Sequence, residues 1–173
     1  MSSDVVVIPL ASHADARGAL TEIFRAEWVD DSPVQWNVVR SEANVLRGVH
    51  VHVRHHDYVV PVSGRLLIGL SDLREGTPEF GRARMIELDA DAPQLVVIPP
   101  GVAHGFCSVA SSVFAYGVSD YWDPEHDELG CRWNDPELGL SWPLGMPSLS
   151  QRDTTAGTRA ELLDALRAVR AAW

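Results

Sequence analysis

The chain has 173 residues, of which 46% are hydrophobic and 22% are charged. This length suits one domain with a proper hydrophobic core, and no apolar run approaches the roughly 20 residues that a membrane-spanning helix needs. A net charge of −10 argues against general affinity for nucleic acid, which requires a basic surface. We therefore expect one domain over residues 1–173 that binds neither nucleic acid nor membrane.

Residue usage adds two expectations. The N-terminus, MSSDVVVIPL, lacks the basic and long apolar segments of a signal peptide, and two cysteines do not make a disulfide framework. Both features favour a cytoplasmic protein. All 14 basic residues are arginine, so the chain has no lysine to act as a catalytic cation.

Strand patterns dominate the chain up to about residue 119. Short β-branched or alternating stretches are bounded by Gly, Pro, Asp or Ser, which is typical of short strands. Many short strands separated by turns predict an all-β barrel or sandwich. The expected strands are Val5–Leu10, Ala19–Phe24, Val34–Val39, Val45–Val53, Tyr58–Val62, Arg65–Leu70, Ala83–Leu88, Gln94–Ile98 and Val113–Ser119.

The C-terminal segment, residues 122–173, has a different pattern. It begins as a loop-rich stretch with several prolines and tryptophans. Thr158 and Glu161 then have the spacing of a capping box. Leu162, Leu163, Leu166 and Val169 follow at helical spacing, so we expect a short helix whose apolar face packs on the barrel or on a partner subunit.

A histidine-rich stretch, GVHVHVRHHDYVVPVSG, carries the first candidate site. His50 and His52 are two residues apart and therefore point to the same face of a strand. With Asp57 and His104 they form the pattern H-x-H-x4-D-x6-G followed by P-x-G-x2-H, which resembles the two motifs of metal-binding cupins. The resemblance implies a double-stranded β-helix jelly roll. One alternative is therefore a divalent transition metal held by His50, His52, Asp57 and His104.

Two neighbouring histidines, His55 and His56, lie in a polar turn, and we expect both to be solvent-exposed.

Further motifs resemble one cupin branch over residues 8–153. The order and identity of these motifs are similar to the dTDP-4-dehydrorhamnose 3,5-epimerases. The segments that match are DARGALTE, QWN, VLRGVH, DLREGTPEFG, IPPGVAHGF, YGVSDYWDP, WNDPELG, WP and SQRD. The resemblance implies an isomerase that needs no cofactor and works on a nucleotide-linked 4-keto-6-deoxy sugar.

Epimerisation beside a keto group needs a base, an acid on the opposite face and stabilisation of the enolate. By resemblance, His50 is the base, Asp153 its orienting partner and Tyr116 the acid. The resemblance also implies a homodimer, and it assigns a larger set to substrate binding. Arg17 and Arg47 would bind the diphosphate, and Gln35 and Asn37 would make further substrate contacts. Trp122 and Glu22 would lie near the nucleotide base. Asp57 and His104 would also bind substrate.

The active-site strand departs from the epimerase pattern at two positions. Asp57 lies seven residues before Gly64, where the family carries a lysine beside the enolate, and His52 replaces a polar residue that is usually Gln. These changes keep three alternatives open: a metal-dependent cupin enzyme, a dTDP-keto-sugar 3,4-ketoisomerase, and a sugar-nucleotide-binding cupin without catalysis. The WNDPELG tail weighs against the ketoisomerase.

Overall fold

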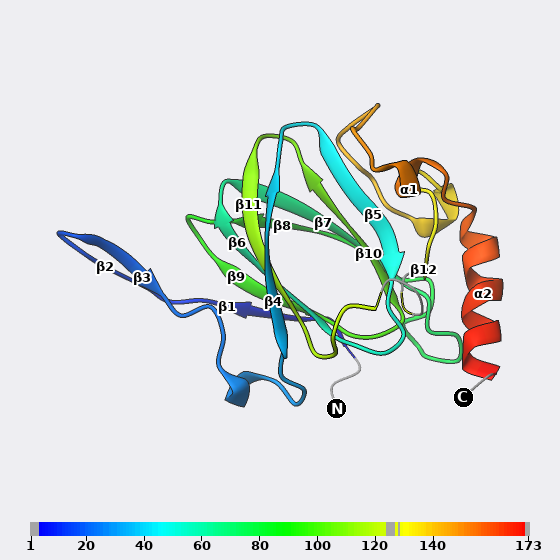
Figure 1. The fold of residues 1–173 in the computed structure, drawn as a ribbon, viewed down its shortest axis with the longest axis horizontal. Coiled ribbons are helices and arrows are strands. Elements are labelled where there is room, and N and C mark those ends of the chain that lie inside the picture. Colours follow the sequence, from blue (N-terminus) through cyan, green and yellow to red (C-terminus); the bar gives the residue numbers. More distant parts are fainter. Residues whose placement is uncertain (1–3, 124–126, 128, 172–173) are drawn as a thin grey trace.

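The computed structural model describes residues 4–123, 127 and 129–171. Two five-stranded antiparallel sheets that face each other form the body of the structure (Figure 1). The first sheet runs β1 (Val6–Pro9), β9 (Gln94–Ile98), β6 (Asp57–Ser63), β11 (Ser112–Val118) and β4 (Gln35–Ser41). The second runs β12 (Leu129–Gly130), β5 (Val45–Val51), β10 (Val102–Ser108), β7 (Arg65–Asp72) and β8 (Ala83–Asp89). The all-β prediction is confirmed.

The remaining elements lie outside the two sheets. The hairpin of β2 (Ser12–Asp15) and β3 (Gly18–Thr21) projects away from the barrel (Figure 1). Single turns of 3₁₀-helix form at η1 (Ala26–Trp28) and η2 (Pro136–Leu138). The chain ends with the one-turn helix α1 (Gln151–Thr154) and with α2 (Arg159–Ala171). None of the helices in the described part of the chain has the length and apolarity that crossing a membrane requires.

Apolar side chains from both sheets fill the space between them. Alternation along the strands places one set of side chains inside. The central cluster comprises Val59, Leu66, Ile68, Leu70, Leu88, Val96, Ile98, Val102 and Phe114. Strands β6 to β11 all contribute to this cluster, so it joins the two sheets.

The predicted C-terminal helix and its cap are confirmed. Thr158 N donates to Glu161 Oε2 (2.6 Å), and Glu161 N donates to Thr158 Oγ1 (3.2 Å). Leu162, Leu163 and Leu166 are buried against β5 and the tail, in a cluster with Val49, Val51, Leu73, Ala103, Cys131 and Leu138. The helix therefore covers the outer face of the sheet that carries β5.

The nine predicted strands all overlap observed strands, but β2, β10 and β12 were not predicted. The sequence of β10, VAHGFCS, has small and polar residues instead of a long β-branched run. It forms a strand because β5 and β7 pair with it on both sides. Tertiary pairing here overrides a weak local preference.

Candidate active site

A cavity of about 460 Å³ lies between the two sheets. Its walls come from β5, β6, β10, β11 and α1, so both sheets and the C-terminal tail contribute. His50 and His104 are direct partners in the β5–β10 ladder, which brings the two predicted motifs side by side. The cavity is lined by the predicted residues Arg47, His50, His52, Asp57, His104, Tyr116, Trp122 and Asp153.

His50 forms a hydrogen-bonded pair with Asp153. His50 Nε2 lies 2.6 Å from Asp153 Oδ1, and Gly48 N donates to Asp153 Oδ2 (3.4 Å). Burial alone would raise the pKa of Asp153, but the hydrogen bond and charge interaction with His50, together with hydrogen bonds from Ser150 and Gly48, outweigh burial and lower the pKa. Asp153 is therefore an anion at neutral pH. Because a carboxylate only accepts, His50 carries its proton on Nε2, and Nδ1 keeps a free lone pair.

Local geometry fixes both members of this pair. Asp153 lies in α1, where its N–H donates to the N-cap Ser150 Oγ (3.1 Å). Gly48 has φ +120°, and a Cβ there would lie 2.8 Å from Gly105 Cα and from His104 O. Only glycine therefore allows β5 to approach β10 this closely two residues before His50.

Tyr116 lines the same cavity from β11, in the opposite sheet. Its ladder partners are Asn37 on β4 and Val59 on β6. Burial and the nearby Asp57 carboxyl raise the pKa of the phenol. Tyr116 thus stays protonated at neutral pH and faces the cavity from the sheet opposite His50.

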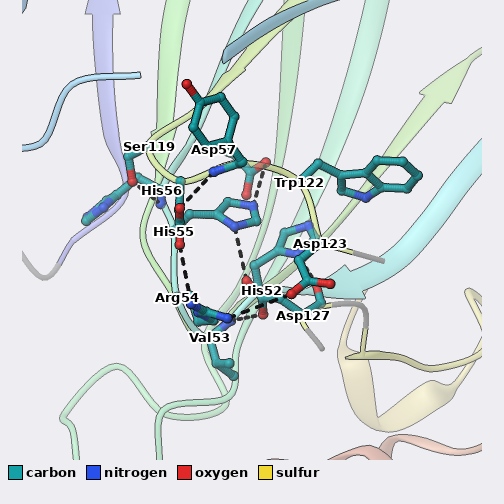
Figure 2. Close-up of polar contacts among 12 residues, drawn as sticks. His52, Val53, Arg54, His55, His56, Asp57, Ser119, Trp122, Asp123 and Asp127 are labelled. Carbon is teal, nitrogen blue, oxygen red and sulfur yellow. Dashed lines mark hydrogen bonds and ion pairs between the residues drawn. The ribbon is translucent and has the colours of Figure 1, made fainter. Parts of the chain in front are cut away.

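Five residues form a second polar group, the buried His–Asp cluster: His52, His55, Asp57, His104 and Asp127. Each is at most 7% exposed. His52 Nδ1 lies 2.8 Å from Asp127 O, and His55 Nδ1 lies 3.1 Å from Asp127 Oδ2 (Figure 2). Asp127 Oδ1 accepts from Val53 N (2.7 Å). Asp127 therefore contacts His52, Val53 and His55, and it holds the turn that carries both histidines in place.

Burial sets the protonation of most of this cluster. It lowers the pKa of His52 and lowers that of His104 well below the ordinary value, and it raises the pKa of Asp57. His55 differs, because although burial lowers its pKa, the contacts with Asp127 and Asp57 outweigh burial and raise it. His52 and His104 are therefore neutral imidazoles at pH 7.

The prediction that His55 and His56 are solvent-exposed is wrong. His55 is 2% exposed because Asp127 packs over it, and the His56 side chain is 15% exposed with Nδ1 3.2 Å from Asp31 Oδ2. The partner of His55, Asp127, lies 72 residues away in the chain, and the partner of His56, Asp31, lies 25 residues away. The sequence around the two histidines therefore does not indicate these contacts. Only His52, Asp57 and His104 of the predicted metal ligands come together, since His50 is held by Asp153.

Two arginines line the cavity near α1. Arg47 was predicted, and its Nε donates to Ser41 Oγ (3.1 Å). Arg152 was not predicted as a site residue, although it lies beside Asp153 in the quoted SQRD motif. Together these guanidinium groups make the cavity wall attractive to an anion inside an acidic protein.

The remaining predicted residues lie at the rim or away from the cavity. Gln35 and Asn37 point inward from β4, joined by a 3.1 Å bond from Gln35 Nε2 to Asn37 Oδ1, and Gln35 Oε1 accepts from Trp122 N (3.3 Å). Arg17 is in the β2–β3 hairpin and Glu22 just after it, where they pair with Asp15 and Arg25. The structure does not bring these two into the cavity of their own chain.

The two-sheet jelly roll, with histidines on neighbouring strands facing an interior cavity, defines a cupin. The family profile for dTDP-4-dehydrorhamnose 3,5-epimerase matches residues 2–161, and the chain belongs to this family. A Pseudomonas aeruginosa dTDP-4-dehydrorhamnose 3,5-epimerase is 35% identical over 87% of this chain and 88% of its own. A Neisseria gonorrhoeae relative of the same name is also 35% identical, and this chain spans about half (51%) of its length.

Solved structures agree with this assignment. An epimerase from Legionella pneumophila, in complex with dTDP-4-keto-L-rhamnose, is 33% identical with a TM-score of 0.84 over 91% of each chain. NovW, a 4-keto-6-deoxy sugar epimerase from Streptomyces spheroides, is 31% identical with a TM-score of 0.86 over 94% of this chain and 86% of its own.

Proposed function

We propose that this protein is an epimerase of a dTDP-linked 4-keto-6-deoxy sugar and removes a proton from a carbon next to the keto group. The observation that carries the proposal is the His50–Asp153 pair, 2.6 Å apart, in a cavity that Tyr116 enters from the opposite sheet. Family membership supports the substrate class. The enzyme is an isomerase, and the reaction moves protons without redox chemistry.

His50 serves as the base. Its Nε2–H is held by the Asp153 carboxylate, so the lone pair on Nδ1 takes the proton from the sugar carbon. The negative charge of Asp153 then stabilises the imidazolium that forms. Because Asp153 is buried and anionic, it favours this charge separation without solvent rearrangement.

Tyr116 serves as the acid on the other face. A planar enolate bound between the two sheets has one face toward His50 and one toward Tyr116. Delivery of the phenolic proton to the carbon inverts its configuration. Solvent then returns a proton to the Tyr116 phenolate, and the His50 imidazolium releases its proton to solvent. The raised pKa of Tyr116 keeps its proton available at neutral pH.

Arg47 and Arg152 serve the diphosphate. Both line the cavity beside α1, and paired guanidinium groups match phosphate oxygens well. Trp122, which is 52% exposed at the rim, offers an aromatic face to the thymine base. These contacts place the sugar ring between His50 and Tyr116.

We also propose that two copies of the chain pair in the cytoplasm. The outer face of β4 exposes Trp36 and Val38, and neighbouring Val34 is 54% exposed. The projecting β2–β3 hairpin has the reach to carry Arg17 and Glu22 to a partner's cavity (Figure 1). A light-scattering mass of one chain at working concentration would contradict this arrangement.

Solvent-deuterium exchange tests the reaction. In D₂O, wild type should incorporate deuterium into dTDP-4-keto-6-deoxyglucose, and His50→Ala should lose this exchange by at least about 10³-fold. The matched control His56→Gln, whose side chain contacts Asp31 outside the cavity, should exchange like wild type. Full exchange by a folded His50→Ala variant would rule out His50 as the base.

A further inference from the structure

Three buried side chains in the cavity have no part in the proposed proton transfers. His52, Asp57 and His104 lie beside the His50–Asp153 pair, and one potential ligand atom from each lies within 4.8 Å of the other two. We propose that these three residues bind one divalent transition-metal ion. This site goes beyond the proposed epimerase function and differs from the predicted ligand set, because His50 is not part of it.

The hydrogen bonds of the His52 and His104 imidazoles use Nδ1 and leave Nε2 free to bind a metal ion. His52 Nδ1 lies 2.8 Å from Asp127 O, and His104 Nδ1 lies 3.1 Å from Val102 O. A carbonyl oxygen only accepts, so both Nδ1 atoms carry the proton and both Nε2 atoms keep a lone pair. Metal-binding histidines typically donate their second ring N–H to a carbonyl or carboxylate in this way.

The separations around Asp57 fit a shared ion better than hydrogen bonds. His104 Nε2 lies 3.8 Å from Asp57 Oδ2, and His55 Nε2 lies 3.8 Å from Asp57 Oδ1. Both distances are too long for hydrogen bonds. Two ligands of one ion, each about 2.0–2.2 Å from it, lie roughly 3–3.5 Å apart. A movement of a few tenths of an ångström therefore converts the His104–Asp57 contact into coordination, and His52, whose ligand atom lies within 4.8 Å of the other two, needs a movement of at most about 1.5 Å.

His55 provides an independent sign that a ligand is missing from the cluster. Its side chain is 2% exposed, and its Nε2 is buried without a hydrogen-bond partner in the described part of the chain. This nitrogen faces the Asp57 carboxyl (Figure 2). A buried polar atom without a partner is costly, so the cluster is arranged for a further group beside Asp57.

The charge balance leads to the same conclusion. Asp57 is 4% exposed, the chain has no lysine, and no arginine pairs with Asp57 among the described residues. The basic groups within ion-pair distance of Asp57 are the imidazoles of His55 and His104, and a divalent cation between Asp57, His52 and His104 would add the compensating charge that a buried carboxylate needs. Two imidazoles and one carboxylate suit transition metals more than magnesium or calcium.

Three protein ligands leave coordination positions open toward the cavity, as in catalytic metal sites. Resting on the proposed function, we infer that a bound ion would supply positive charge near the sugar keto oxygen in a chain that has no lysine for this purpose. The residues of this chain would then hold a Lewis acid next to the His50 base.

Metal content and cobalt spectra test the site without any substrate. Protein expressed without a histidine tag should carry close to one equivalent of a transition metal by elemental analysis. After chelator treatment it should bind one equivalent of Co²⁺ and develop visible ligand-field bands. Asp57→Asn and His52→Gln should each bind Co²⁺ more than about 100-fold more weakly.

Two controls isolate the site from folding and from the proposed reaction. Asp153→Asn should bind Co²⁺ like wild type although its proton exchange is impaired, and His56→Gln should also bind normally. Thermal unfolding of each variant reports whether the barrel has folded. Wild type that binds neither Co²⁺ nor Zn²⁺ stoichiometrically, or a folded Asp57→Asn variant that keeps wild-type affinity, would overturn the metal site. Neither result would affect the test of His50 as the base.

Discussion

Asp153 Oδ1 lies 2.6 Å from His50 Nε2, although 103 residues separate them in the chain. The imidazole comes from the middle of the second sheet, and the carboxylate comes from a one-turn helix in the tail. The tail thus completes the proposed catalytic pair, which the barrel alone does not contain.

Asp153→Asn should slow turnover and spare binding. The amide keeps the shape of the carboxylate but removes the charge that stabilises the His50 imidazolium. We expect kcat to fall by about 10²–10⁴-fold with KM within a few-fold of wild type, measured with a dTDP-4-keto sugar. Asp164→Asn on the exposed face of α2 is the control. A change confined to KM would contradict this role for Asp153.

Gly48→Ala should destabilise the protein more than Gly76→Ala. Both glycines have positive φ, +120° and +83°, but only at Gly48 would a Cβ meet backbone atoms at 2.8 Å. The difference between the variants isolates the clash from the backbone strain, and we expect about 1–3 kcal/mol in the free energy of unfolding. Urea unfolding measures it. If both variants lost the same free energy of unfolding, β5 and β10 would be able to move apart at Gly48 without a cost in stability.

Arg47→Gln and Arg152→Gln should each weaken dTDP binding. A hydrogen bond to a charged group contributes about 1.5–3 kcal/mol, which corresponds to roughly 10–100-fold in Kd. Isothermal titration calorimetry gives the value, and Arg65→Gln, on the exposed side of β7, should bind like wild type. Unchanged affinity in Arg152→Gln would remove it from the diphosphate site.

The carboxyl of Asp135 should make stability depend on pH. Burial alone would raise its pKa, but bonds from the backbone N–H groups of Arg159 and Glu137, with Arg132 nearby, outweigh burial and lower it. A lowered folded pKa stabilises the protein fully above the unfolded pKa of about 3.9, and this stabilisation disappears as pH falls through the folded pKa. Wild type should therefore exceed Asp135→Asn in stability at pH 6, and the gap should close below about pH 4 in urea unfolding. A gap that stays constant with pH would contradict this role.

Both cysteines should be inert in the folded protein. Cys107 and Cys131 are fully buried free thiols, and burial raises the pKa of Cys107 to about 11 and that of Cys131 to about 12. Ellman's reagent at pH 8 should label neither cysteine before unfolding and both afterwards. Rapid labelling of native protein would mean that the tail or α2 opens locally.

Much of the fold was predictable because its strands have strong local patterns. β4, for example, alternates inward Gln35, Asn37 and Val39 with outward Trp36 and Val38, and its period of two appears directly in the sequence. Strand β10 lacks such a pattern and depends on its neighbours. Motif resemblance identified His50, Tyr116 and Asp153 as residues of one site, and the cavity contains all three.

The buried His–Asp cluster was only partly predictable. The spacing of His52, Asp57 and His104 indicated a shared site, but nothing local in the sequence relates His55 to Asp127, 72 residues later. Contacts made by an irregular loop follow neither helical nor strand periodicity. Arg152, next to the predicted Asp153 in the one-turn helix α1, was overlooked because its local sequence does not indicate that it lines the cavity.

The late position of Asp153 also affects how the protein matures during synthesis. At about 5–20 residues per second, the ribosome adds the 103 residues between His50 and Asp153 in roughly 5–20 seconds. The strands from β6 to β11 are added during the same interval, so the barrel strands up to Val118 are all synthesised before the anion that orients the imidazole. Under the proposed mechanism, proton abstraction therefore requires α1 to have docked, and a chain that stops before α1 would lack the carboxylate that orients the proposed base.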